Sequence, residues 1–190
     1  HKVIVLAGHE CNAITDIYLN DEIVTLNSDT VTSAPWNSKV KIYKHLGGQT
    51  AATDTFNGSS ATLTNTLHSE AEVESTFVGK GLCYLYVRLE YDQNVFANGI
   101  PIITAVVEGK KVYNSATNTT AYSANAALVI RDFITASYGL NDDQTNDISF
   151  EASASICADT VATLDGNETK YEINGVVKAN EKIGDVLQDF

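Results

Sequence analysis

The segment Cys83–Tyr91 constrains the fold most strongly, because its apolar side chains alternate along the chain with the two-residue period of a β-strand. One face of the predicted strand is apolar, and the other is first aromatic and then charged. The apolar face carries Cys83, Leu85, Val87, Leu89 and Tyr91, and the second face carries Tyr84, Tyr86, Arg88 and Glu90. We expect the apolar face to build a core. The second face is expected to be half covered by another element or by a subunit, and Tyr84, Tyr86 and Arg88 are candidate interface residues in the second case.

A turn and a second strand follow this segment. Asn98 and Gly99 supply turn chemistry, and Pro101 is expected at the entry of the next strand because proline cannot donate to a strand ladder. The run Ile102–Val107 predicts a strand buried on both sides. Cys83–Asn114 therefore predicts a rigid strand–turn–strand unit without obvious catalytic chemistry.

The region before Cys83 is rich in strand and turn signals. Residues 13–26 predict two strands about an Asn20–Asp21 turn, residues 27–36 predict a surface loop, and residues 39–46 predict a further strand. The Gly-, Ser-, Thr- and Asn-rich stretch 47–66 predicts a long polar loop. Such a loop is either a partner-contacting segment or a surface insertion without a role. As a contact surface it would use Trp36, Tyr43, Asn57 and Asn65.

Helical signals come late in the chain. Residues 123–140 predict an amphipathic helix capped by Ser123 or Asn125 and ended by Gly139. Residues 147–164 predict a second helix capped by Asp147 or Ser149. A strand pair is predicted about Asn174–Gly175, and a third helix is predicted behind Asn180.

The order of these elements predicts an α+β fold, in which a mixed or antiparallel sheet region is followed by two to three amphipathic helices and a late hairpin. We expect a β-rich subdomain over 1–80 and an α+β domain over 81–190, with one continuous domain as the alternative. The length of 190 residues allows either arrangement.

The net charge of −12 argues against direct nucleic-acid binding, which needs clustered Lys and Arg. The densest basic cluster, which is Lys39, Lys41, Lys44 and His45, is small and is expected to lie at a solvated strand edge. No run reaches the length of apolar residues that a transmembrane helix needs.

The three cysteines are scattered and odd in number, which argues against a disulfide framework. Cys83 and Cys157 lie among apolar neighbours, where a free cysteine is usually a small buried hydrophobe. The chain contains no methionine and begins with His1, so we expect it to be a segment of a longer polypeptide.

Catalytic and metal chemistry find little support in the sequence. His9, Glu10, Cys11 and Asp16 are metal-ligand types without a second cluster at a defined spacing, so loop capping is preferred. Residues 141–147 lack the Gly and Glu that a calcium loop requires. We expect no catalytic residue, no metal and no cofactor.

Several ordered blocks resemble the central hub proteins of long-tailed phages, a family that includes the tip attachment or host-specificity J protein of lambda-like phages. The blocks are "AGHECNAITDIYLNDE", "YLYVRLEYDQNVFANGIPIITAVVEGKKVYN", "AYSANAALVIRDFITASYGL", "FEASASICADTV" and "YEINGVV". Together they cover about three-quarters of the chain. Ala126 stands where the family often has Pro, and residues 47–76 diverge.

The resemblance implies a structural protein of the virion, made in the host cytoplasm. In that family three copies close the distal end of the tail, and distal tail, tape-measure and fibre proteins attach there. The alternative is a carbohydrate- or receptor-binding module that uses the loop 47–66 with Trp36 and Tyr43. A hydrolase is disfavoured, because no acid pair or catalytic triad is evident.

Overall fold

The fold is α+β and divides into two compact units, unit 1 (His1–Lys110) and unit 2 (Lys111–Phe190). The computed structural model describes residues 1–48, 79–137, 139–178 and 180–190. The division falls after Lys110, whereas the sequence placed it after residue 80, so the two strands predicted to open the second domain belong to unit 1.

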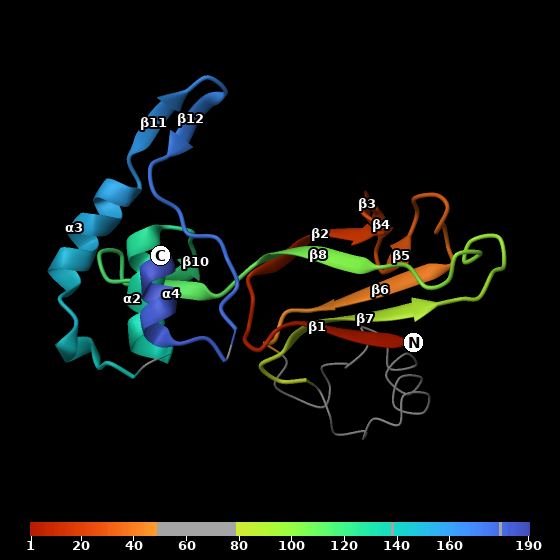
Figure 1. Cartoon of the computed structure of the whole chain (residues 1–190), viewed down its shortest axis with the longest axis horizontal. Helices are drawn as coiled ribbons and strands as arrows, with labels where there is room; N and C mark the ends of the chain where they lie inside the picture. The colour runs from red at the N-terminus through yellow and green to blue at the C-terminus, as the bar shows by residue number, and fades with distance from the viewer. Residues whose placement is uncertain (49–78, 138, 179) are drawn as a thin grey trace. The chain divides into compact units, whose positions relative to one another are not determined.

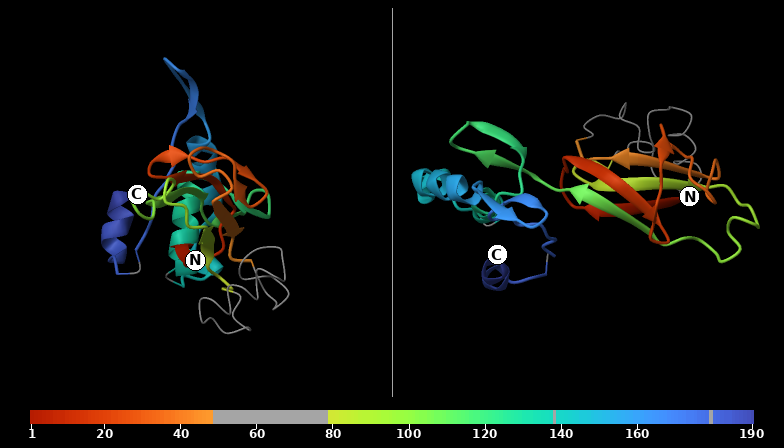
Figure 2. Two further views of the ribbon diagram at one scale, coloured as in Figure 1. Left: turned by 90° about the vertical axis from the view of Figure 1, so that its right-hand side faces the viewer. Right: turned by 90° about the horizontal axis from the view of Figure 1, so that it is seen from above.

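Unit 1 contains two antiparallel sheets (Figures 1 and 2). The five-stranded sheet has the order β1-β7-β6-β5-β4, and the three-stranded sheet has the order β3-β2-β8. The strands are β1 (Lys2–Ala7), β2 (Ala13–Leu19), β3 (Glu22–Ile23), β4 (Leu26–Asn27), β5 (Thr30–Val31), β6 (Val40–His45), β7 (Cys83–Leu89) and β8 (Ile103–Glu108).

The core of unit 1 lies between these two sheets. Ile17 and Leu19 of β2, Ile42 of β6, and Leu85 and Val87 of β7 are buried in one cluster. This arrangement confirms that Cys83, Leu85 and Val87 form one apolar face, as the alternation predicted. Burial of branched side chains between two sheets is the main source of stability in such a unit.

Two predicted turns are present in unit 1. Asn20 and Asp21 both have positive φ, of 51° and 64°, as a two-residue hairpin between β2 and β3 requires. Gly99 has φ of 90°, and its N–H donates to the carbonyl of Phe96 at 2.9 Å. Pro101 lies just before β8, as expected for an entry residue.

The strand–turn–strand from Cys83 to Asn114 is not a hairpin, because β7 and β8 lie in different sheets and residues 90–102 cross between them. Burial of β8 on both sides was also a wrong prediction. Ile103, Ala105 and Val107 pack on the core, whereas Thr104 and Val106 are exposed. A short run of Ile and Val does not by itself distinguish a strand covered on one face from one covered on both.

Two further predictions for unit 1 were wrong. The predicted surface loop 27–36 contains β5 and places Trp36 in the core with 5% exposure. The basic cluster of Lys39, Lys41, Lys44 and His45 was expected at a solvated strand edge. It belongs to β6 and the residue before it, and β6 lies between β5 and β7. Lys41 lies on the face of β6 turned away from the core, whereas Lys44 lies on the core-facing side and its Nζ donates to the Ile14 carbonyl of β2 at 2.7 Å.

Unit 2 combines two small hairpins with short helices (Figure 1). The hairpins are β9 (Lys111–Asn114) with β10 (Thr119–Tyr122), and β11 (Thr160–Thr163) with β12 (Gly166–Thr169). The helices are α2 (Ala126–Asp132), the π-helical turn η1 (Phe133–Ser137), the 3₁₀ turn η2 (Asp142–Gln144), α3 (Asp147–Cys157) and α4 (Ile183–Asp189).

The first predicted helix is present with Asn125 as its cap, but the α-helix ends at Asp132 and the π-helical turn η1 follows it. The Asn125 side chain accepts hydrogen bonds from the N–H groups of Ala127 and Leu128. Gly139 has φ of 70°, and its N–H donates to Thr135 at 3.0 Å. The third helix is also present as α4.

The second helix and the late hairpin differ from their predictions. α3 ends at Cys157 and is capped by Asn146, and the residues that follow form β11 instead of continuing the helix. The late hairpin turns between Thr163 and Gly166, whereas no strand pair forms about Asn174–Gly175. Leu164 and Asp165 form the turn, and Gly166 begins β12 with a φ of 133°, a conformation that glycine adopts readily.

Candidate functional site

An aromatic cluster occupies the face of the five-stranded sheet that is turned away from the core. The register pairs Tyr43 of β6 with Tyr86 of β7, and His45 with Tyr84. The Tyr43 and Tyr86 rings stack with centroids 5.4 Å apart, and the His45 and Tyr84 rings stack at 4.4 Å. Such cross-strand aromatic pairs stabilise a sheet beyond the area they bury. We call Tyr43, His45, Tyr84 and Tyr86 the aromatic cluster.

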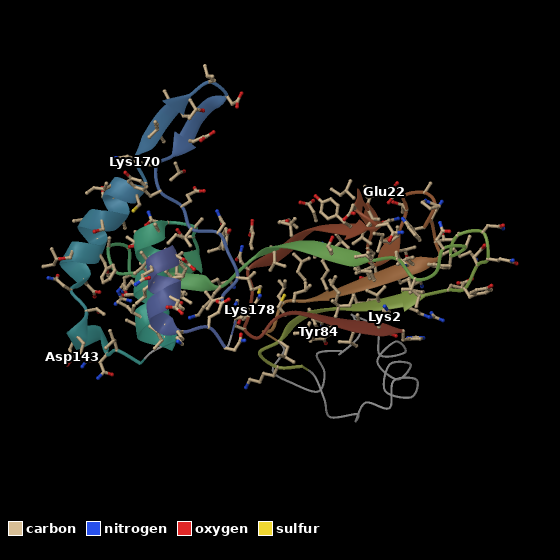
Figure 3. The ribbon with its side chains drawn as sticks, viewed as in Figure 1. Lys2, Glu22, Tyr84, Asp143, Lys170 and Lys178 are labelled. Atoms are coloured by element: carbon tan, nitrogen blue, oxygen red, sulfur yellow. The ribbon has the colours of Figure 1, made fainter. Side chains whose placement is uncertain are left out.

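The aromatic cluster is interior, not surface. Tyr84 and Tyr86 are each 0% exposed, and Tyr43 is 1% exposed. Figure 3 labels Tyr84 on β7. His1 adds a stacked ring at 5.7 Å from Tyr86 and a hydrogen bond between its Nδ1 and the Tyr86 hydroxyl. Burial raises the pKa of Tyr43, and the nearby Asp29 carboxylate adds to this effect.

This burial changes the predicted subunit interface. Tyr84 and Tyr86 pack within unit 1, so neither ring is available for direct contact with a neighbouring chain. Arg88, the third predicted residue, is exposed on the same face of β7. An interface role for Arg88 stays a prediction.

The charged end of this face carries a small ion-pair group. Lys39 Nζ lies 3.0 Å from Glu90 Oε1 and 3.7 Å from Asp92 Oδ2. The hydrogen bond to Glu90 raises the pKa of Lys39. Ser38, Lys39, Lys41, Arg88 and Glu90 line a shallow depression of mixed charge. Exposed pairs of this kind contribute little stability.

The predicted partner-contact residues do not gather into a binding platform. Trp36 packs on Phe96 at 5.9 Å inside unit 1, and Tyr43 belongs to the buried aromatic cluster. Neither ring can present its face to a sugar, as the alternative function required. Asn57 and Asn65, with most of the loop 47–66, lie outside the described residues.

The turn predicted to be structural is anchored to another turn of unit 1. The Ile102 N–H donates to Asn20 Oδ1 at 2.9 Å, and the Asn20 N–H donates to the Ile102 carbonyl at 2.9 Å. Asn98 is exposed, and Pro101 is buried beside this bond pair. The bonds of Ile102, which directly follows Pro101, hold the start of β8, and a structural role for Asn98 and Gly99 stays a prediction.

The candidate metal ligands near the N-terminus have other contacts. His9 Nδ1 forms a hydrogen bond with the Glu10 carbonyl at 2.9 Å, and Cys11 Sγ lies 3.8 Å from the same ring nitrogen. Across the part of the chain that the structure describes, no three His, Cys, Asp or Glu side chains form a group able to hold a metal ion.

Unit 2 holds a buried charge that the sequence analysis missed. Arg131 is 3% exposed, and its Nε donates to Asp147 Oδ1 at 2.8 Å. Its guanidinium also lies 5.2 Å from the centre of the Tyr113 ring. The contact links α2, the start of α3 and β9. The sequence signal for this buried charge was Arg131 itself, which directly follows the apolar run 126–130.

Unit 2 also leaves much apolar surface uncovered. None of the residues of α3 is buried, and Ile148 on this helix is 79% exposed. Leu164 at the tip of the β11–β12 hairpin is fully exposed, and Val161 of β11 is 47% exposed. All eight residues of these two strands are exposed. Figure 2 shows this hairpin extending away from the helices of unit 2, and Lys170, labelled in Figure 3, marks its base.

Among the described residues, no helix combines the length and apolar character needed to cross a membrane. Comparisons with protein-family models, with curated proteins and with solved structures found no match to this chain.

Proposed function

We propose that this chain is a structural component of a phage tail tip. It is a segment of the central hub protein that closes the distal end of the tail and helps to present the host-recognition parts. Its partners are other copies of itself in a homotrimer, together with distal tail, tape-measure and fibre proteins. Its location is the virion.

The exposed apolar surface of unit 2 carries this proposal. An isolated two-stranded hairpin is marginally stable in water, and a helix without a fully buried residue gains little stability from packing. In unit 2 both features occur together, at β11–β12 and at α3. Apolar surface of this extent is typical of a protein that packs against others in an assembly.

Sequence blocks distributed through both units support the same function. The hub-like blocks include β2 with its Asn20–Asp21 turn, β7 with β8, and the capped helix α2. The aromatic platform that a sugar-binding module would need is buried, so the tail-tip proposal is preferred to the carbohydrate-binding alternative.

The location is tested by immunogold electron microscopy of virions from the phage that encodes the chain. An antibody raised against the chain should label the distal end of the tail. Label along the tail tube, on the capsid or nowhere on purified virions would contradict the proposal.

The assembly surface is tested by charge substitution on α3 in the full-length protein. Ile148→Asp and Ile156→Asp should reduce the number of complete tails seen by electron microscopy, because a carboxylate cannot be buried cheaply in an apolar contact. Ser155→Asp adds the same charge at an exposed polar position of the same helix and serves as the matched control. Equal yields of complete tails for all three variants would show that α3 is not part of the assembly surface.

A further inference from the structure

Two cysteines that are far apart in the sequence lie side by side in unit 1. The ladder between β1 and β7 ends with Ala7 opposite Cys83. After β1 the chain turns back, and the Cys11 N–H donates to the Leu46 carbonyl at 2.8 Å. Leu46 directly follows His45, the β6 residue that is paired with Tyr84. Cys11 is thereby placed next to Cys83 at the same end of the five-stranded sheet.

The two side chains belong to the same apolar core. Cys11 is 1% exposed and Cys83 is 0% exposed, and both belong to the cluster between the sheets. Each thiol influences the pKa of the other, which is lowered for Cys11 and raised for Cys83 by the neighbouring thiol. Close backbone packing holds the Cys11 side in place, since a Cβ on Gly47 would come within 2.7 Å of the Glu10 Cα.

We propose that Cys11 and Cys83 are a disulfide-forming pair, whose thiols join within one chain under oxidising conditions and link the segment after β1 to β7. Cys157 belongs to unit 2 and takes no part in this pair. The proposal concerns unit 1 alone and is independent of the tail-tip function.

The chemistry needs a small oxidant of the peroxide class, such as hydrogen peroxide. The Cys11 sulfur attacks one peroxide oxygen, the O–O bond breaks, and water leaves, so that Cys11 becomes a sulfenic acid. The Cys83 sulfur then attacks the Cys11 sulfur, the S–O bond breaks, and a second water carries away the Cys83 proton. Two thiols and one peroxide thus give one disulfide and two waters.

The surroundings make Cys11 the first of the two to react. Burial raises the pKa of both thiols, to about 12 for Cys83, so both are slow nucleophiles at neutral pH. The neighbouring Cys83 side chain lowers the pKa of Cys11, which partly offsets the effect of burial there. Cys11 also lies nearer to solvent, because its Sγ is 3.8 Å from the ring of exposed His9.

A link between residues 11 and 83 closes a long loop. A disulfide that closes a long loop stabilises the fold mainly by restricting the unfolded chain. The pair would therefore remain a dithiol in a reducing compartment and become a stabilising link after exposure to an oxidising one.

The test is peptide mapping of the whole chain after graded peroxide treatment, with alkylation under denaturing conditions. Trypsin places the three cysteines in separate peptides, 3–39, 81–88 and 132–170. The expected product is the 3–39 peptide joined to 81–88, lighter than the sum of the two by two hydrogen atoms, with Cys157 alkylated. The unfolding midpoint of unit 1, followed by Trp36 fluorescence, should rise by about 10 °C and return after reduction.

Cys157→Ser should retain both the linked peptide and the shift in midpoint, and Cys11→Ala and Cys83→Ala should each lose both. Mapping of the parent chain needs no variant, so a substitution that fails to fold leaves the proposal testable. Peroxide treatment that leaves peptides 3–39 and 81–88 separate, or that joins either one to 132–170, would overturn it.

Discussion

The two units of this chain differ in how completely they bury their apolar side chains. Unit 1 buries a cluster between two sheets and a second, aromatic cluster on the outer face of the five-stranded sheet. Unit 2 buries a few residues around α2 and α4 and leaves α3 and the β11–β12 hairpin uncovered. Unit 1 therefore gains more of its stability from buried apolar contacts than unit 2 does, and the exposed apolar residues of unit 2 are consistent with the proposed assembly surface.

The largest expected difference in stability is between alanine substitutions of two tyrosines, one in each unit. Tyr86→Ala should destabilise unit 1 by about 4 kcal/mol, because it removes a fully buried ring with two stacking partners. Tyr171→Ala in unit 2 should change stability by less than about 0.5 kcal/mol, since Tyr171 is 54% exposed.

Chemical denaturation separates the two units in this measurement. Trp36 is the one tryptophan and reports on unit 1, and the helices that the structure describes all belong to unit 2, so their far-ultraviolet circular dichroism reports on that unit. Tyr86→Phe keeps the stacking and removes only the hydroxyl, so it should lie much closer to the parent. A small effect of Tyr86→Ala would contradict the interior position of the aromatic cluster.

A pair of isoleucines extends the comparison to the main core. Ile17→Ala in β2 should cost unit 1 about 3 kcal/mol, because it leaves a cavity between the sheets. Ile148→Ala on α3 should be neutral or slightly stabilising, since the side chain is exposed and alanine is the better helix former. Equal losses at the two sites, read from the same denaturation curves, would mean that α3 is packed as well as β2.

The alternation in Cys83–Tyr91 predicted the two faces of β7 correctly, because side-chain direction in a strand follows from local geometry. Which face is covered depends on segments distant in sequence. Tyr84 and Tyr86 were therefore expected at a surface, although both are buried. The same limit explains β8, whose Ile and Val residues could not show that only one face is covered.

Errors in unit 2 come from competition between local signals. Val161 continues the helical spacing of α3, yet the turn before Gly166 and the β-branched residues of Thr160–Thr163 favour a hairpin. Of the candidate site, the exposed position of Arg88 and the positive φ of Gly99 agree with the sequence, and the interface role of Arg88 stays a prediction. The contact between Cys11 and Cys83 was not, because it depends on the β1–β7 and β6–β7 registers.

Alkaline pH should lower the stability of unit 1, by a smaller amount than the core substitutions do. The pKa of Cys83 is about 12 in the folded chain and near 9 when unfolded, so the unfolded chain loses this proton first. Stability from this group is complete below about pH 9 and falls as the pH rises toward 12. At about pH 10 in the presence of a reductant, unit 1 should lose about 1 kcal/mol relative to neutral pH.

Cys83→Ala is the matched control for this pH effect, and it should show a smaller alkaline loss of unit 1 stability by Trp36 fluorescence. The raised pKa values of Cys11 and Tyr43 act in the same direction, so some loss remains in the variant. The same alkaline slope in the parent and the variant would contradict a protonated, buried Cys83.

The last prediction concerns the contacts that stabilise unit 2, which lacks a large core. Asn125 caps α2 through its side-chain oxygen, and its Nδ2 donates to the Ala154 carbonyl of α3 at 2.8 Å. Asn125→Ala should destabilise unit 2 by about 1 kcal/mol, whereas Asn125→Asp keeps the cap and loses only the link to α3. If the helical signal of Asn125→Asp melts with that of the parent and Asn125→Ala melts earlier, the cap is the main contribution. Should both variants melt early while Trp36 fluorescence is unchanged, the bond between α2 and α3 is what holds this helix in unit 2.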